Sequence, residues 1–195
     1  PFSANPDILC SPADGKALVY PHLGTDIQLP IKGCHASIES LLGDAADPSY
    51  YINGAALVVR LAPYDYHRFH FPDSGTAGAT QLLSGHYHSV NPIALQSTPD
   101  IFCLNKRAIT EIETDSFGRI AYIEVGALNV ASIVQTHVEG PVERGDEKGY
   151  FQFGGSTIVL LFAAGHAAFD ADLIGDSCNG LEVHVRTGEA VGRRA

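Results

Sequence analysis

The sequence predicts a mainly β protein with minor α content, built as a closed or sandwiched antiparallel sheet in a single domain. Short runs rich in Val, Ile, Leu and aromatic residues alternate with clusters of Gly, Pro, Asn and Asp, which is typical of many short strands joined by turns. Of the 195 residues, 45% are hydrophobic and 17% are charged. This composition indicates one compact domain with a sizeable core.

One short helix stands out near the N-terminal third of the chain. Residues 37–42 form this predicted helix, because Ile38 and Leu41 fall on one face. Ser37 can cap its start, and Gly43 can end it.

The predicted strands are short runs of apolar and β-branched residues, and the predicted turns are the Gly-, Pro- and Asp-rich stretches between them. The clearest strands are residues 56–61, 121–130, 132–138 and 157–162, and the clearest turns are residues 73–78, 140–141 and 144–146.

Charge and targeting signals narrow the class of protein. The formal net charge of −10 argues against nucleic-acid binding and against simple electrostatic docking on an anionic membrane. The apolar runs are shorter than the roughly 20 residues of a membrane-spanning helix, and no signal peptide is visible. The chain contains no Met, so we expect that the start of the translation product is missing. We expect a cytoplasmic or peripheral membrane protein.

The four cysteines are scattered and include no C-x-x-C pair, so we expect free thiols in a reducing compartment. They are Cys10, Cys34, Cys103 and Cys178.

A small hydroxyl residue precedes the most apolar strand of the sequence. Ser156 follows Gly154 and Gly155 and is followed by the run 158–162. Glycine tolerates backbone geometry closed to other residues, so the Ser156 hydroxyl could reach the Gly155 carbonyl carbon. Such a segment suits a chain that cleaves itself, although Gly-Gly-Ser-Thr before a strand is also an ordinary turn.

Four stretches in the same order carry a family resemblance that extends from about Asp7 to Gly192. They are residues 11–15 (SPADG), 61–72 (LAPYDYHRFHFP), 89–92 (SVNP) and 144–162 (RGDEKGYFQFGGSTIVLLF). With them the chain resembles the phosphatidylserine decarboxylase family, in its GGST-type branch, whose members are pyruvoyl-dependent. The resemblance implies an antiparallel β barrel-sandwich core and a single catalytic domain over residues 1–195.

The resemblance also implies a self-processing site. Asp14, His70 and Ser156 resemble a serine-protease-like triad that acts on the enzyme's own chain, with His70 as the base. Cleavage between Gly155 and Ser156 would give a β chain (residues 1–155) and an α chain (residues 156–195) that begins with a pyruvoyl group made from Ser156. Read locally, Asp14 before a glycine is also an ordinary turn residue.

The implied reaction converts phosphatidylserine to phosphatidylethanolamine and CO₂ through a Schiff base with the pyruvoyl ketone. His67 and His70 are both candidates for the acid that protonates the carbanion. Tyr87, His88 and Asn91 are candidate substrate-binding residues, although Asn91 before a proline equally suits a turn. The resemblance further implies a homodimer of β/α heterodimers, with membrane contact through the absent N-terminal region.

Asp65, which precedes the histidines, is expected to cap the local turn or to pair with Arg68.

Three other functions are compatible with parts of the sequence. The same pyruvoyl machinery could decarboxylate a soluble, aromatic L-amino acid. A metal-binding β-barrel could use the imidazoles of His67-x-x-His70 and His86-x-His88, although the family needs no metal in its active site. An inactive scaffold is disfavoured, because the whole set of motif residues is intact.

Overall fold

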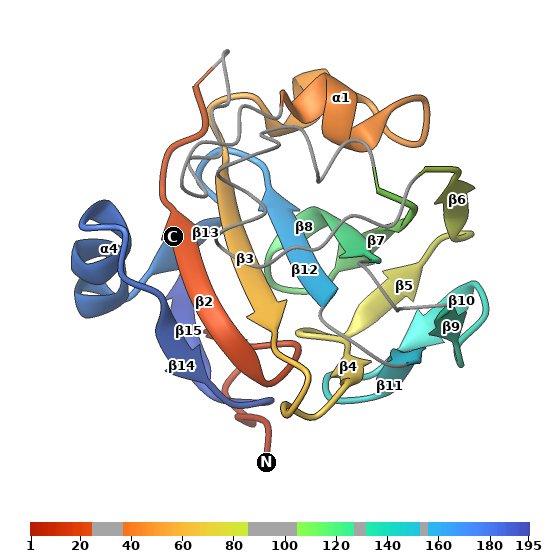
Figure 1. Ribbon diagram of the computed structural model, residues 1–195. Helices are drawn as coiled ribbons and strands as arrows, with labels where there is room; N and C mark the ends of the chain where they lie inside the picture. Colours follow the sequence, from red (N-terminus) through yellow and green to blue (C-terminus); the bar gives the residue numbers. More distant parts are fainter. Residues whose placement is uncertain (25–36, 86–104, 127–131, 153–155) are drawn as a thin grey trace.

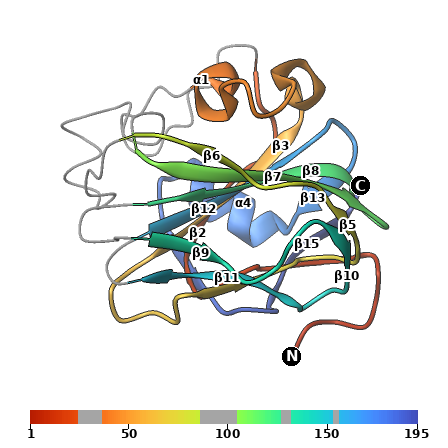
Figure 2. The same ribbon diagram turned by 90° about the vertical axis from the view of Figure 1, so that its right-hand side faces the viewer.

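The computed structural model describes residues 1–24, 37–85, 105–126, 132–152 and 156–195. Its strands pair antiparallel in three sheets. Figure 1 shows the central strands of the largest sheet side by side, and Figure 2 shows a smaller sheet below this sheet and the helix α1 above it. The predicted mainly β, antiparallel architecture is confirmed as a sandwich; among the described strands, no sheet closes into a barrel.

The largest sheet has nine strands and contains most of the core. In spatial order they are β10 (Gly140–Val142), β5 (Gly75–Ala77), β7 (Arg107–Thr114), β8 (Gly118–Val125), β12 (Ser156–Phe162), β3 (Ala55–Leu61), β2 (Gly15–Tyr20) and β14 (Val183–Val185), with β6 (Gln81–Leu83) paired to β7.

Two three-stranded sheets and short helices complete the described structure. One sheet has the order β4 (Arg68–His70), β11 (Glu147–Gln152) and β9 (Ser132–Gln135), and the other has β1 (Ile8–Cys10), β15 (Ala190–Arg194) and β13 (Ala167–Phe169). The helices are α1 (Ile38–Leu42), the 3₁₀ turn η1 (Pro48–Tyr51) and α4 (Ala171–Cys178).

The clearest sequence signals gave the right elements. The helix predicted at 37–42 is α1: the Ser37 side chain caps it, and the Gly43 N–H bonds back to the Glu39 carbonyl. The four predicted strands correspond to β3, β8, β9 and β12, but β9 ends at Gln135, so the prediction of strand at 136–138 is wrong. Residues 127–130 of the second predicted strand lie outside the described residues.

Two predicted turns are wrong in part, because they contain short strands. Residues 75–77 form β5 and residues 140–142 form β10, and these two strands pair with each other. The strand β5 requires glycine at position 75, because a Cβ there would lie 2.1 Å from the Glu113 carbonyl oxygen on β7. The third predicted turn, at 144–146, is a turn.

β12 forms the centre of the core. Each of its seven residues is buried, and the strand pairs with β3 on one side and β8 on the other. A strand covered on both faces needs a continuous apolar run rather than alternation, and residues 158–162 supply one. Within the described residues, none of the helices has the length and apolar character needed to cross a lipid bilayer.

We expect Leu160→Ala in β12 to lower the free energy of unfolding by about 2–5 kcal/mol, because it leaves a cavity in a fully buried site. The matched control is Leu82→Ala, whose side chain is 61% exposed and which we expect to change stability by less than about 0.5 kcal/mol. Chemical denaturation of both variants measures the difference, and equal losses would contradict this assignment of the core.

Candidate active site

Ser156 is the first residue of the central strand β12 and lies opposite Leu61 of β3. The residue is fully buried, and its Oγ has no hydrogen-bond partner among the described residues. Buried hydroxyls are normally hydrogen-bonded, so an unpartnered one requires an explanation. A hydroxyl held ready for a reaction is one such explanation.

The side chain of Ser156 faces the space between the nine-stranded sheet and the β4–β11–β9 sheet. Side chains alternate along a strand, so Ser156 shares a face with Ile158. Ile158 lies opposite Glu124 of β8, and Tyr122 of β8 is on that same face. The Tyr122 ring lies 6.1 Å from the ring of Phe69 on β4, which places this face against the smaller sheet.

His70, at the end of β4, has a defined tautomer. Its Nδ1 lies 2.9 Å from the Gly145 carbonyl oxygen. Because a carbonyl only accepts hydrogen bonds, Nδ1 carries the proton and Nε2 presents its lone pair. The ring stacks on Tyr66 with centroids 6.2 Å apart, and the backbone N–H donates to the Pro12 carbonyl (2.9 Å).

The pairing of the segment around β4 with β11 places His67 beside a residue that is closer in sequence to Ser156 than the partner of His70. The His67 carbonyl accepts a hydrogen bond from the Phe151 N–H (3.0 Å), whereas His70 lies opposite Glu147, further from Ser156 in the chain. The Nδ1 of His67 contacts the Asp65 carbonyl oxygen at 2.6 Å, which again leaves the proton on Nδ1.

Asp14 precedes β2 at the same end of the sheet. Its Oδ1 accepts hydrogen bonds from the Thr187 N–H and the Thr187 hydroxyl, both at 2.8 Å. Among the described contacts, no hydrogen bond joins Asp14, His70 and Ser156 to one another. The His70 Nδ1 is already bonded to the Gly145 carbonyl, so a hydrogen-bonded triad would require the imidazole to change partner.

Asp65 has the capping role that the sequence suggested but does not make the predicted ion pair. Its Oδ2 accepts a hydrogen bond from the Ala62 N–H at 2.7 Å. Arg68 pairs instead with Glu147 on the adjacent strand β11 (2.6 Å), because β4 and β11 are direct neighbours.

Several residues predicted from the sequence lie outside the described residues, and no group of three or more metal-ligating side chains occurs within the described ranges. The predicted residues outside are Gly155, Tyr87, His88 and Asn91, together with His86, Cys34 and Cys103.

The structure also contains a buried ion pair that the sequence analysis missed. Lys148 Nζ lies 2.5 Å from Glu124 Oε1 and 2.8 Å from Gln135 Oε1. Burial raises the pKa of Glu124 and lowers the pKa of Lys148, and in each case the partner's opposite charge offsets part of the shift. A glutamate inside the apolar run 120–125 was the sequence signal that could have indicated this pair.

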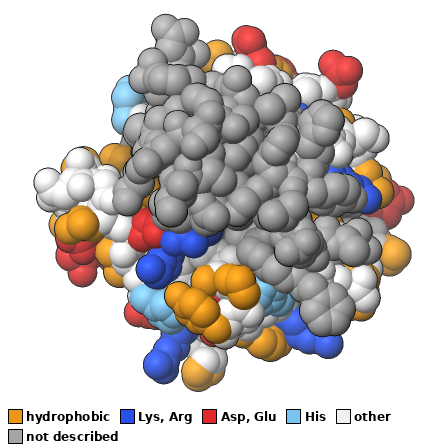
Figure 3. Space-filling view, in the orientation of Figure 1, with side chains coloured by type: hydrophobic (Ala, Val, Ile, Leu, Met, Phe, Trp, Pro, Cys, Tyr) orange, Lys and Arg blue, Asp and Glu red, His pale blue; other side chains and the backbone are white. Residues whose placement is uncertain are grey.

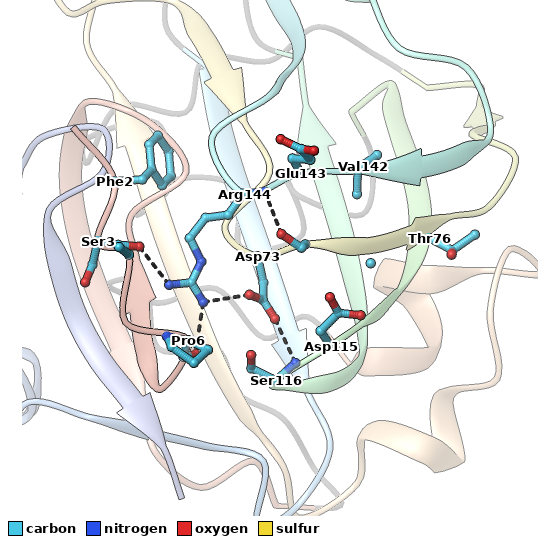
Figure 4. Close-up of a pocket in the computed structure, with 13 residues that line it drawn as sticks. Phe2, Ser3, Pro6, Asp73, Thr76, Asp115, Ser116, Val142, Glu143 and Arg144 are labelled. Carbon is cyan, nitrogen blue, oxygen red and sulfur yellow. Dashed lines mark hydrogen bonds and ion pairs between the residues drawn. The ribbon is translucent and has the colours of Figure 1, made fainter.

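A cavity of about 670 Å³ lies elsewhere on the molecule, and none of these candidate residues lines it. Figure 4 shows that Arg144 spans it from the β10 side toward the N-terminal segment. The Arg144 guanidinium donates to Asp73 Oδ1 (2.6 Å) and to the Ser3 and Pro6 carbonyls (both 3.0 Å). Its role in the fold is therefore to anchor the first residues of the chain.

The turn between β3 and β4 has an apolar surface. Figure 3 shows hydrophobic side chains over this turn, with His and Lys or Arg side chains around them. Tyr64 is 79% exposed and Tyr66 is 47% exposed. The exposed apolar surface thus lies on the segment that leads into His67 and His70.

Comparison with known proteins identifies the family of the chain. The family model described as phosphatidylserine decarboxylase matches residues 1–193. Phosphatidylserine decarboxylase proenzymes from Chlamydia felis and Chlamydia trachomatis serovar L2 are 45% and 47% identical over 194 and 195 residues, which cover 99% and 100% of this chain and 65% of each relative. The proenzyme from Ruminiclostridium cellulolyticum is 44% identical over 192 residues, 98% of this chain and 64% of the relative.

The chain therefore spans just under two thirds of the length of these relatives. Because the family match covers nearly every residue, including the segments that contain Asp14, His67, His70 and Ser156, the chain belongs to the phosphatidylserine decarboxylase family.

Proposed function

We propose that this chain is the catalytic domain of a self-processing, pyruvoyl-dependent decarboxylase that converts phosphatidylserine to phosphatidylethanolamine and CO₂. The observation that carries the proposal is the buried, unpartnered hydroxyl of Ser156 at the start of the central strand, in a chain of this family. Cleavage before Ser156 would separate residues 1–155 from residues 156–195. A serine in this position fits the formation of a pyruvoyl group from its own backbone and side chain.

Self-cleavage begins with attack of Ser156 Oγ on the carbonyl carbon of residue 155. The oxygen–carbon bond forms, the carbon–nitrogen bond breaks, and the hydroxyl proton passes through a base to the released amine. His70 is the proposed base, because its Nε2 carries the lone pair. Asp14 is the proposed orienting carboxylate, with Thr187 holding one of its oxygens; to orient His70 during cleavage it would replace the Gly145 carbonyl as the partner of Nδ1. β-Elimination of the ester then releases residues 1–155, and hydrolysis of the new end releases ammonia.

A pyruvoyl group supplies a ketone that condenses with the substrate amine and withdraws electrons as CO₂ leaves. The protein has to orient that amine and return a proton to the substrate carbon. His67 and His70 are the proposed proton donors, and the contact of each Nδ1 with a backbone carbonyl holds each ring in one orientation.

The exposed tyrosines of the β3–β4 turn support a lipid substrate over a small soluble amine. Tyrosine combines an apolar ring with a polar hydroxyl and is favoured at membrane–water interfaces. We further propose the assembly implied by the family, a homodimer of β/α heterodimers. Light scattering on the purified protein measures this oligomeric state.

We expect intact-mass spectrometry to find residues 1–155 and a fragment 156–195 that is lighter by one ammonia than the serine-initiated peptide. Ser156→Ala should remain one uncut chain, because it lacks the attacking oxygen. The processed protein should release CO₂ from phosphatidylserine in detergent micelles.

Two outcomes of that experiment would contradict the proposal. An uncut wild-type chain would rule out self-processing. A processed chain that releases CO₂ from an aromatic L-amino acid, and none from phosphatidylserine, would support the soluble-substrate alternative.

We expect His70→Ala to block self-cleavage, because Ser156 loses its base, a contribution of about 10²–10⁴-fold. His67→Ala is the matched control, and we expect it to cleave itself normally. The cleaved His67→Ala protein is then assayed for CO₂ release. A time course on denaturing gels distinguishes the two. Efficient cleavage of His70→Ala together with a block in His67→Ala would reassign the base to His67.

We expect Thr187→Val to slow self-cleavage about fivefold, since it removes one of two hydrogen bonds to Asp14, worth roughly 1 kcal/mol. Thr187→Ser keeps the hydroxyl and should cleave at the wild-type rate. Equal rates for all three proteins would argue that the Asp14–Thr187 contact has no part in processing.

A further inference from the structure

The ion pair between Lys148 and Glu124 is a costly feature of the interior. The side chains are 2% and 0% exposed, and removing two charges from water is repaid only by close, well-oriented contacts. Lys148 has such contacts, with Glu124 at 2.5 Å, Gln135 at 2.8 Å and the Tyr122 ring centroid at 5.0 Å. An apolar pair would fill the same space without this cost, so the charged pair calls for a role beyond packing.

A β-bulge turns Lys148 into the interior. The register of β11 against β4 shifts between Glu147 and Gly149, so Lys148 is an extra residue. In a regular strand Lys148 would share a face with Tyr150, yet Lys148 is buried while Tyr150 is partly exposed. The next residue must be glycine, because a Cβ on Gly149 would lie 2.2 Å from the Val134 carbonyl oxygen.

One charge lies on the strand that precedes the predicted cleavage site in the chain, and the other lies on a strand that pairs with the strand after it. Lys148 belongs to β11, which ends at Gln152, and Ser156 begins β12 only a few residues later. Glu124 belongs to β8, which pairs with β12 along the register Ile158–Glu124. The ion pair therefore connects the strand before the cleavage site to the neighbour of the strand after it.

Glu124 and Ser156 also share one face of the sheet. They lie diagonally on adjacent strands, a relation that separates residues by about 7–8 Å and is within reach of long side chains. Glu124 Oε2 and Ser156 Oγ are both buried and have no partner within the described residues. The carboxylate and the serine hydroxyl thus belong to the same face of the large sheet.

We propose that Lys148 and Glu124 are positioning residues for self-cleavage: their ion pair holds β11 against β8 and so sets the approach of the Ser156 hydroxyl to the preceding carbonyl. This inference rests on the proposed function and adds to it two residues outside the Asp14, His67, His70 and Ser156 set. The same inference explains the bulge in β11, which places the Lys148 side chain in the interior.

The test is the double variant Lys148→Met/Glu124→Met in the whole chain. Replacing both charges by apolar side chains of similar length leaves no buried unpaired charge, so folding should persist. We expect self-cleavage to slow by about tenfold or more, because misplacement of reacting groups is costly. The thermal midpoint, measured in the uncut Ser156→Ala background, should equal or exceed that of Ser156→Ala alone.

Hydroxylamine separates a positioning role from a later defect, because it cleaves the ester formed by the first attack. We expect it to give no added cleavage of the double variant, since the attack itself is slowed. Rapid hydroxylamine cleavage would place the defect after ester formation and would overturn the proposal.

The matched control removes an exposed ion pair at the other end of β8. Glu113→Gln/Arg119→Met should cleave within about twofold of the wild-type rate, because surface pairs contribute little. Cleavage of Lys148→Met/Glu124→Met at this same rate would overturn the inference and leave the proposed function intact. An uncut wild-type chain would overturn both.

Glu124→Asp provides a second test if the double variant does not fold. It keeps both charges and withdraws the carboxylate by one methylene, so we expect cleavage to slow by about threefold or more. An unchanged rate in a folded Glu124→Asp protein would also overturn the proposal.

Discussion

The burial of β12 on both faces is the constraint on which the rest of the structure depends. Every residue of Ser156–Phe162 is buried between β3 and β8, and the first of them is the serine on which self-processing would depend. The backbone of Ser156 pairs with β3, and from Thr157 onward β12 pairs with both β3 and β8. This rigidity suits a reaction in which the nucleophile and the bond it attacks belong to the same chain.

Two chain crossings between the layers bring the candidate residues to one end of the sandwich. β3 leaves the large sheet at Leu61, opposite Ser156, and enters the smaller sheet as β4; β11 leaves the smaller sheet and the chain returns as β12. The DYHRFH motif lies on the first crossing, and Ser156 begins the strand that follows the second. Backbone carbonyls then orient both histidines through their Nδ1 atoms.

Local signals predicted part of this fold well. The helix α1 was predictable because its cap, its apolar face and its terminating glycine lie within a few residues of one another. The short strands β5 and β10 were not, because their sequences read as turns and they become strands only through tertiary pairing, β5 with β7 and β10 with β5. Tertiary pairing also explains why Arg68 bonds Glu147 on the paired strand β11 rather than Asp65, which is near it in sequence.

The sequence by itself determined the family and the residues proposed for the chemistry, because rare motifs in a set order are a property of the chain alone. Tertiary structure decided the partners of those residues: Asp14 is held by Thr187, His70 by Gly145, and the Ser156 hydroxyl is left unpartnered. The Lys148–Glu124 pair was beyond sequence reasoning. Its members meet because a bulge in β11 turns the Lys148 side chain into the space between the two sheets, where it reaches Glu124 on β8.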